Sequence, residues 1–325
     1  LLALDGSNNN TILGANATLA VSLANSKCSA LSKKKSLFEN LGSNFSLPVP
    51  LMNIINGGAH ADNDLNIQEF MIRPDSAKNF LDAIEKCFLV INNLKKLLKS
   101  KKMLTNVGDE GGFAPSINTN EEALEFIVKA IEKSELIPGK DIVICLDVAA
   151  NELINDKGEY SVQSKNFMSA DDVINYYKKL SSVYPIKSIE DPFAEEDWLS
   201  WKKITHEIGK NVQIVGDDLF VTNSVRLSRG IQEKSANSIL VKPNQIGTLT
   251  ETLEVVSMAQ KANLNTIISH RSGDTEDTFI ADLAVATMSS QIKTGSLARS
   301  ERVAKYNRLL RIEEELGNQA KMARI

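Results

Sequence analysis

The chain has 325 residues, of which 42% are hydrophobic and 24% are charged, and its formal net charge is −4. This composition is typical of a globular protein with room for one large α/β barrel or two smaller domains. The mild acidity and the scattered basic residues argue against direct nucleic-acid binding, and no apolar run approaches the roughly 18 residues of a membrane-spanning helix.

The N-terminal part of the chain is expected to be helical. Residues 1–45 contain a small-residue helix at 16–25 that needs a packing partner, and the start at Leu1 without a Met leaves the true N-terminus open. No signal peptide precedes this segment, and we expect a cytoplasmic protein. The three cysteines, Cys28, Cys87 and Cys145, are predicted to be reduced core residues and not a disulfide framework or a zinc site.

The middle of the chain carries polar residues beside predicted strands and glycines. After a strand at 51–55 and a glycine loop at 56–63, a second strand at 67–72 carries Gln68 and Glu69.

A long helix is predicted to follow at 76–102, because apolar residues recur there at steps of three and four. A second glycine loop then holds Glu110. The capping pairs Thr119–Glu122 and Ser169–Asp172 predict two later helix starts.

Six successive apolar runs in the rest of the chain each end in a charged or ionisable residue. A run of this kind is typical of a buried strand whose carboxyl end reaches a surface. Eight strand candidates alternating with helices predict an α/β fold, a (β/α)8 barrel with an irregular start, whose parallel strands end at one rim. A doubly wound open sheet is the alternative, but it would not bring all six ends into one ring. The six residues are Asp147, Glu190, Asp217, Lys242, His270 and Lys293.

Three of these strand ends are carboxylates on consecutive strands. Asp147, Glu190 and Asp217 would repel one another strongly unless some are protonated or a cation lies among them. A set of oxygen ligands without His or Cys favours a hard ion, Mg²⁺ first. The alternative for each acid alone is that it caps the helix that follows. Asp191, next to Pro192, is assigned to a turn and not to the metal.

Two lysines are expected on the other side of the same ring. Lys242 or Lys293 beside a divalent cation and a second ammonium would have its neutral form favoured, as a general base requires. A structural ion pair with one of the acids is the alternative for either lysine. Glu69 and Glu110 would supply the acid of a β-elimination.

A segment that binds an anion is predicted after the seventh strand. Arg271 and Ser272 at a helix start would provide a guanidinium and a hydroxyl for a phosphate. His270 and His60 lie at rim and loop positions. The residues alone therefore predict Mg²⁺-dependent proton abstraction α to a carboxylate on a phosphorylated substrate.

Motifs in order along nearly the whole chain resemble the enolase (phosphopyruvate hydratase) family. The most specific are Gly108-Asp-Glu-Gly-Gly, Ser188-Ile-Glu-Asp-Pro-Phe and Ser269-His-Arg-Ser-Gly, and the loop His60-Ala-Asp-Asn resembles bacterial members. The other similar segments are residues 13–22, 53–58, 68–71, 216–219, 244–247, 291–295 and 311–317.

The resemblance implies a lyase that interconverts 2-phosphoglycerate and phosphoenolpyruvate in glycolysis and gluconeogenesis. It implies that Lys242 is the base and Glu110 the proton donor, assisted by Glu69, with His270 beside the phosphate and His60 on a closing loop. It implies Mg²⁺ ligation by Asp147, Glu190 and Asp217. The residues expected to hold substrate are Gln68, Glu69, Lys242, Arg271, Ser272 and Lys293.

The resemblance also predicts the domain organisation. Residues 1–45 resemble the last helices of the family's N-terminal α+β domain, and residues 46–325 resemble its catalytic barrel. A mobile loop of the N-terminal domain completes a second Mg²⁺ site with substrate. If this chain is the whole molecule, we therefore expect metal binding at one site and weak or no turnover. The full-length protein is expected to form a homodimer or a higher homo-oligomer, with no membrane partner and with a possible surface or secreted fraction.

Two other functions are compatible with this fold. Another enzyme of the same superfamily, such as a cycloisomerase or an acid-sugar dehydratase, would lack the phosphate segment at 269–272 and the loop at 108–112. A non-catalytic binding or scaffold role is the second alternative, and nothing in the sequence selects it. Formation of phosphoenolpyruvate from 2-phosphoglycerate with Mg²⁺ would distinguish the three.

Overall fold

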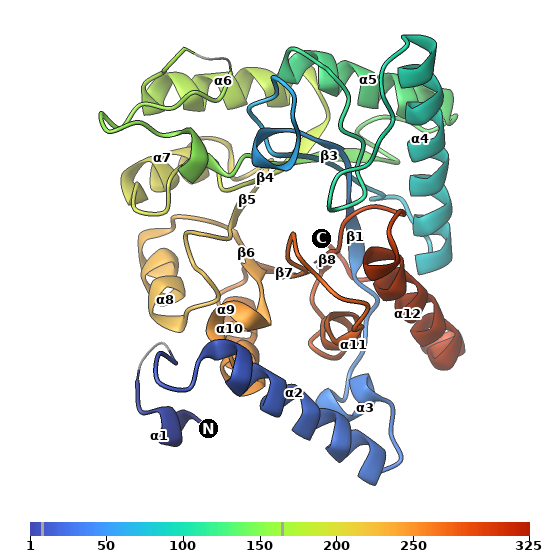
Figure 1. The fold of residues 1–325 in the computed structure, drawn as a ribbon, viewed down its shortest axis with the longest axis vertical. Coiled ribbons are helices and arrows are strands. Elements are labelled where there is room, and N and C mark those ends of the chain that lie inside the picture. The colour runs from blue at the N-terminus through green and yellow to red at the C-terminus, as the bar shows by residue number, and fades with distance from the viewer. Residues whose placement is uncertain (8–9, 164–165) are drawn as a thin grey trace.

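The computed structural model describes residues 1–7, 10–163 and 166–325. At its centre, eight strands close into a barrel in the order β1 to β8, ringed by helices (Figure 1). The expected α/β barrel is therefore confirmed. The strands are β1 (Val49–Asn56), β2 (Glu69–Arg73), β3 (Val143–Asp147), β4 (Ile186–Glu190), β5 (Gln213–Gly216), β6 (Ser238–Val241), β7 (Asn265–Ser269) and β8 (Gln291–Lys293).

The irregular start of the barrel is a reversed strand. β2 runs antiparallel to both β1 and β3, whereas the other neighbouring strands are parallel, so the expectation of parallel strands throughout is wrong for β2. The reason is the connection, because β1 and β2 are joined by a loop without a crossover helix. The reversal brings Glu69, the first residue of β2, level with Asp147, the last residue of β3.

The helices lie outside the barrel and begin where local capping favours them. Thr119 and Ser169 accept hydrogen bonds from the backbone amides of Glu122 and Asp172, as predicted. The α-helices are α1 (Leu2–Asp5), α2 (Ala15–Ser32), α3 (Leu37–Leu41), α4 (Phe80–Ser100), α5 (Asn120–Lys133), α6 (Ala170–Val183), α7 (Trp198–Ile208), α8 (Ser224–Glu233), α9 (Pro243–Ile246), α10 (Leu249–Lys261), α11 (Phe279–Ala286) and α12 (Ser300–Leu316). Short 3₁₀ helices are η1 (Gly58–His60), η2 (Ala150–Leu153) and η3 (Gly317–Gln319).

The reversal of β2 also determines the path to Glu110. Because β2 leads away from the rim, α4 returns the chain toward it, and α5 leads away again before β3 begins. The helices α4 and α5 pack against each other. The loop between them, which contains Glu110, therefore lies at the same rim as the strand ends.

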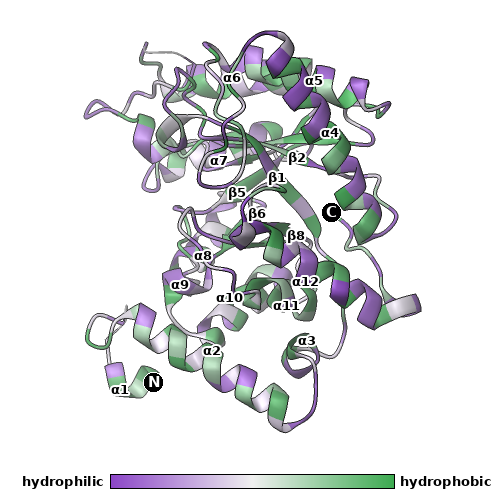
Figure 2. Cartoon of the chain, turned by 45° about the vertical axis from the view of Figure 1, so that its right-hand side comes forward, coloured by the Kyte–Doolittle hydropathy of each residue, from purple (hydrophilic) through white to green (hydrophobic). Residues whose placement is uncertain are grey.

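Apolar side chains form two separate layers. The larger cluster fills the space between the strands and the helices, and a smaller one fills the barrel interior. In Figure 2 the strands are mostly apolar, whereas the outer helices mix apolar and polar residues. Cys87 and Cys145 are buried as predicted, but Cys28 is exposed on α2, so that prediction is wrong for Cys28. The interior cluster consists of Leu51, Met71, Val143, Cys145, Val215, Leu240 and Ile267.

The segment before the barrel packs on its outside. Helices α2 and α3 lie beside α9, α10 and α11 (Figure 1), and the backbone amide of Leu249 donates to Ser22 Oγ at 3.1 Å. The small-residue helix therefore has the partner that its sequence requires. The domain boundary at residue 45 stays a prediction. Among the described residues, no helix combines the length and the apolar character needed to cross a membrane.

The packing of α8 on the barrel depends on a glycine. A Cβ at Gly230 would lie 2.7 Å from Phe220 Cζ and closer still to Cε1. Overpacking costs about 1–3 kcal/mol, whereas replacing a helical glycine by alanine regains at most about 1 kcal/mol. We expect Gly230→Ala to lower the free energy of unfolding measured in urea. Gly273→Ala, whose Cβ would meet no atom within 4 Å, is the control. Equal stability of the two variants would contradict this packing.

Candidate active site

The predicted site residues meet at one end of the barrel. Asp147 and Glu190 pair in register, and Lys293 lies level with Ser269. Eleven of the twelve predicted residues line a single cavity of about 200 Å³, and the twelfth, Glu190, contacts the lining residue Lys293. The eleven are His60, Gln68, Glu69, Glu110, Asp147, Asp217, Lys242, His270, Arg271, Ser272 and Lys293.

Lys293 places its ammonium group among three carboxylates. Its Nζ lies 2.8 Å from Asp147 Oδ2, 2.8 Å from Glu190 Oε1 and 3.3 Å from Glu69 Oε1. Burial opposes the charge of this lysine, but the three carboxylates raise its pKa well above the usual value. Lys293 is therefore charged at neutral pH and compensates for part of the negative charge at the rim.

Lys242 forms a second ion pair across the cavity. Its Nζ contacts Asp217 Oδ2, and Gln245 Nε2 donates to Asp217 Oδ1 at 3.0 Å. Burial lowers the pKa of Lys242, but Asp217 more than offsets this and the net shift is upward. Both lysines are thus paired with acids, which is the alternative that the sequence left open. Lys242 can accept a proton only after it separates from Asp217.

Asp191 orients the neighbouring strand end. Its Oδ1 and Oδ2 accept hydrogen bonds of 2.9 Å from the backbone amides of Asp217 and Asp218. Asp191 has a left-handed backbone (φ 40°), as a tight turn after β4 requires. The sequence assigned Asp191 only to a turn, and the structure adds that its carboxylate holds the loop that carries Asp217.

Two buried glutamates face each other on the far side of the cavity. Asn53 Nδ2 donates to Glu110 Oε2 at 3.1 Å, and His60 Nδ1 lies 3.8 Å from Glu69 Oε1. Burial, and then the charge of Glu110, raise the pKa of Glu69 well above its usual value. For Glu110 burial acts in the same direction, but the charges of His270, when it is protonated, and of Lys293 outweigh it and lower its pKa. Of the two glutamates, Glu69 is therefore the one that holds a proton more readily.

His270 is held as a neutral imidazole between a cation and an acid. It is 3% exposed, its Nδ1 contacts the Arg302 guanidinium, and its Nε2 lies 3.5 Å from Glu110 Oε1. Burial is the main cause that lowers the pKa of His270 to about 3, and the charge of Arg302 adds to it. His270 is therefore neutral at pH 7, and Lys293 is the charge that keeps the pKa of Glu110 low at that pH.

The predicted phosphate residues lie in a loop and not at a helix start. Arg271 and Ser272 are exposed, and α11 begins only at Phe279, after the N-cap Thr278. The expectation of a helix N-terminus at this site is therefore wrong, because the intervening residues 273–277 form turns instead of a first helical turn. Arg271 Nη1 lies 3.5 Å from Asn244 Oδ1. Its guanidinium remains accessible to an anion in the cavity.

Several residues that shape the site were missed from the sequence. Asn53 holds Glu110, Gln245 holds Asp217, and Arg302 contacts His270. Asn53 and Gln245 lie in motifs that resembled a family, and that was the available signal. Arg302 lies on α12 in a charged segment that is indistinguishable in sequence from a solvent-exposed helix face.

The chemistry of the rim fits a hard divalent cation. The cavity is lined by seven acidic and three basic side chains, and the buried Glu190 Oε2 has no hydrogen-bond partner among the described residues. Burial, and then Asp147, raise the pKa of Glu190 well above its usual value, so Lys293 compensates for its charge only in part. Asp147, Glu190 and Asp217 together offer only oxygen ligands, which favours Mg²⁺.

Two other groups of acids and histidine among the described residues have ligand atoms within 4.8 Å of one another. In the predicted set, Lys293 bridges Asp147 and Glu190, and Lys242 contacts Asp217. We consider the predicted set the better site because its oxygens already face positive charge, whereas both oxygens of Asp191 are bonded to amides. The two groups are His60, Glu69 and Glu110, and Asp191, Asp217 and Asp218.

Replacing Lys293 by Met should destabilise the metal-free protein strongly. Removing one partner of a buried ion cluster costs about 3–5 kcal/mol. Because Glu69 already has a raised pKa, the folded variant should bind more protons than the unfolded chain. Its stability should therefore fall more steeply than that of the wild type as the pH rises above 4.5. Urea unfolding in the presence of a chelator at several pH values measures this.

The matched control is Lys129→Met. Lys129 forms an exposed ion pair with Glu125 at 3.3 Å, which is worth about 0–1 kcal/mol. We expect this variant to follow the pH dependence of the wild type. Parallel pH profiles for Lys293→Met and the wild type would show that Lys293 does not compensate for the rim acids.

Comparison with known proteins agrees with this geometry. A protein-family model described as "Enolase, C-terminal TIM barrel domain" matches residues 44–325. A relative named "Enolase", from Pelagibacter ubique (strain HTCC1062), is 62% identical over 327 residues, which cover 100% of this chain and 78% of the relative.

Proposed function

The chain belongs to the enolase family, and from this premise we propose that the residues at the rim carry out the family's reaction in the roles described below. The reaction is the reversible dehydration of 2-phosphoglycerate to phosphoenolpyruvate, so the chain is a lyase of glycolysis and gluconeogenesis. The observation that supports these roles best is the shared cavity. Lys242, Glu110 and Arg271 line it together with Asp147 and Asp217, two of the proposed Mg²⁺ ligands.

Lys242 is the proposed general base. It follows β6 directly, its backbone is held by Thr222 Oγ1 at 2.9 Å, and its side chain reaches into the cavity. The ion pair with Asp217 keeps Lys242 charged. If Asp217 turned its carboxylate to another cation, the pKa of Lys242 would fall and its ammonium group would release a proton to solvent. The neutral amine would then remove the proton from C2 of the substrate.

Glu110 and Glu69 are the proposed acid pair. A proton from this pair protonates the leaving 3-hydroxyl, which departs as water while the C2–C3 double bond forms. The raised pKa of Glu69 favours its protonation, and we propose that Glu110, held by Asn53, receives this proton and delivers it to the substrate. In the reverse direction Glu110 removes a proton from water and Lys242 returns one to C2.

The other rim residues hold the substrate. Arg271 and Ser272 face the phosphate, with His270 beside it, and Gln68 and Lys293 face the remaining oxygens. Asp147, Glu190 and Asp217 are the proposed Mg²⁺ ligands. When bound, Mg²⁺ stabilises the negative charge that develops on the substrate carboxylate. His60 lies in η1 at the edge of the cavity, where the loop at 56–63 could close over substrate.

Assembly and location follow from the family. Its members act on a small molecule and are commonly oligomeric. We propose that the full-length protein forms a homodimer or a higher homo-oligomer, that it is located in the cytoplasm, and that residues 1–45 belong to the preceding domain of the family. The second Mg²⁺ is proposed to bind only with substrate.

The roles of base and acid can be separated by isotope exchange. We expect Lys242→Ala to abolish exchange of the C2 proton of 2-phosphoglycerate with deuterated solvent, because this variant lacks the proposed base. Glu110→Gln should retain this exchange and lose formation of phosphoenolpyruvate, because only the second proton transfer is blocked. NMR of the substrate and the absorbance of the product measure the two steps. Exchange that persists in Lys242→Ala would refute the assignment.

Metal dependence tests the three acids. Chelation should abolish turnover and added Mg²⁺ should restore it. We expect Asp217→Asn to weaken Mg²⁺ binding by about tenfold or more, because one of three charged oxygen ligands becomes a neutral amide. Titration calorimetry measures the affinity, with Asp171→Asn, an exposed acid paired with Lys203, as control. Unchanged affinity in Asp217→Asn would exclude it as a ligand.

A further inference from the structure

We propose that Arg302 is a positioning residue that joins the loop of the proton donor to the loop of the phosphate site and selects one tautomer of His270. This inference rests on the proposed function for its kinetic consequences, whereas the tautomer itself can be measured without turnover. Arg302 lies on α12, outside the cavity, and the only proposed substrate-binding side chain that it is seen to contact among the described residues is that of His270. It contacts Arg271 and Ser272 through their backbone carbonyls.

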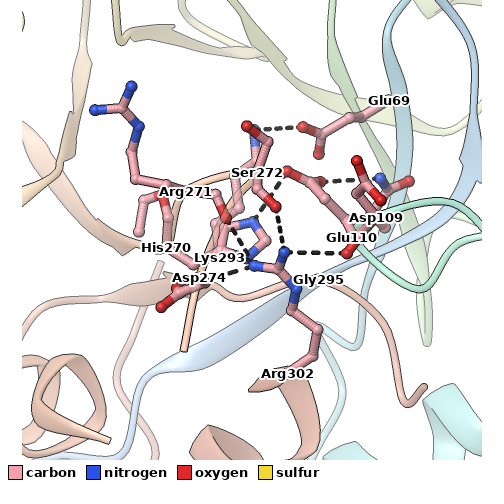
Figure 3. Close-up of polar contacts among 12 residues, drawn as sticks. Glu69, Asp109, Glu110, His270, Arg271, Ser272, Asp274, Lys293, Gly295 and Arg302 are labelled. Atoms are coloured by element: carbon pink, nitrogen blue, oxygen red, sulfur yellow. Dashed lines mark hydrogen bonds and ion pairs between the residues drawn. The ribbon is translucent and has the colours of Figure 1, made fainter. Parts of the chain in front are cut away.

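The two Nη groups of Arg302 are fully used by acceptors from two loops. Nη1 contacts His270 Nδ1 and donates to the Arg271 carbonyl at 2.7 Å, and Nη2 donates to the carbonyls of Ser272 at 2.6 Å and Asp109 at 3.0 Å. Figure 3 shows Arg302 reaching up between these loops. The four Nη hydrogens thus each have one acceptor, and the positions of Glu110 and Ser272 are tied to a single group.

Because Arg302 is buried, its N–H groups depend on protein acceptors. Arg302 is only 1% exposed, and Asp274 Oδ2, 3.9 Å from Nη1, is its nearest carboxylate besides Glu301. A buried cation that is compensated mainly by carbonyl dipoles is costly unless its donors are used. All four Nη donors are used here, whereas Nε has no hydrogen-bond partner among the described residues and lies 3.9 Å from Glu301 Oε1. Lysine has three donors on one atom and cannot reach four acceptors in a plane. Only a planar guanidinium can therefore bind the acceptors of both loops at once.

The contact with His270 determines where its proton lies. A guanidinium can only donate, so His270 Nδ1 must accept and must carry no proton. The proton of the neutral ring is then on Nε2, which lies 3.5 Å from Glu110 Oε1. His270 therefore presents a donor to the cavity, toward the carboxylate of Glu110 and the place where the substrate is proposed to bind.

The same helix supports the far end of the loop. Lys305, one turn after Arg302, contacts the Thr275 carbonyl and lies 3.3 Å from Asp274 Oδ1. Lys305 reaches no part of the Glu110 loop. Arg302 is thus the described cation that bridges the two loops, and Lys305 restrains only one of them.

The first test is ¹⁵N NMR of the protein with labelled histidine. The chain has only three histidines, so a His270→Gln sample assigns the His270 signals. At pH 7 we expect His270 to have a bare Nδ1 and a protonated Nε2, and we expect Arg302→Met to give a mixture of both tautomers. A protonated Nδ1 in the wild type would overturn the inference even if no variant folds. An unchanged tautomer in a folded Arg302→Met would overturn it as well.

The second test is the kinetic split for 2-phosphoglycerate. Arg302→Lys and Arg302→Met should raise KM and lower kcat together, with kcat/KM reduced on the order of 100-fold, as for a misplaced catalytic group. Partial unfolding alone would lower kcat and leave KM unchanged. Arg308→Lys, on the same helix but bonded to Asp282 and Glu315, should stay within about twofold of the wild type.

The outcomes separate this inference from the proposed function. If the full-length wild type, with the N-terminal domain of the family, forms no phosphoenolpyruvate, the proposed function fails, and the tautomer measurement still decides the role of Arg302. If the wild type is active and Arg302→Lys keeps its KM and kcat, the positioning role is refuted.

Discussion

The buried ammonium of Lys293 is the charge on which the rim of this barrel depends. It extends from β8 to carboxylates on β2, β3 and β4, and so crosses the mouth of the barrel. Each of these acids would otherwise cost several kcal/mol, about the effective penalty for one buried ion. One lysine cannot neutralise them all, and the remaining negative charge is what makes the site suitable for a divalent cation.

Arg302 is a second buried cation, and it contacts a different kind of group. Lys293 contacts carboxylates, whereas Arg302 contacts backbone carbonyls and one imidazole. The two cations act on neighbouring residues, because Lys293 lowers the pKa of Glu110, while burial and then the charge of Arg302 lower the pKa of His270 beside it. His270 is therefore less suited than the pair of glutamates to supply the proton for the elimination.

Much of this arrangement could be predicted from the sequence because strand ends are encoded locally. An apolar run that stops at an ionisable residue marked Asp147, Glu190 and Asp217, and the barrel geometry then brought them together. The direction of β2 could not be predicted, because alternation and apolar runs are the same for parallel and antiparallel strands. For the same reason Glu69 was placed inside a strand, although it is the first residue of β2 and lies at the rim.

The contacts between charged groups were beyond sequence reasoning. The acids that each lysine contacts depend on distances that spacing does not determine, and Arg302 had no distinguishing pattern. The late start of α11 was missed because the acidic residues after Ser272 resemble a first helical turn, while residue 279 is where helical hydrogen bonding begins. The motifs that resembled a family indicated the role of each site residue in the reaction. The structure showed which charged side chains contact one another.

The central claim is that Asp147, Glu190 and Asp217 exchange their lysine partners for a divalent cation. The most direct measurement is anomalous X-ray scattering from crystals soaked in Mn²⁺, a stand-in for Mg²⁺ with the same preference for oxygen ligands. We predict one strong peak among these three carboxylates, with Lys242 displaced from Asp217. A peak confined to His60, Glu69 and Glu110, or to Asp191 and Asp218, would contradict the account.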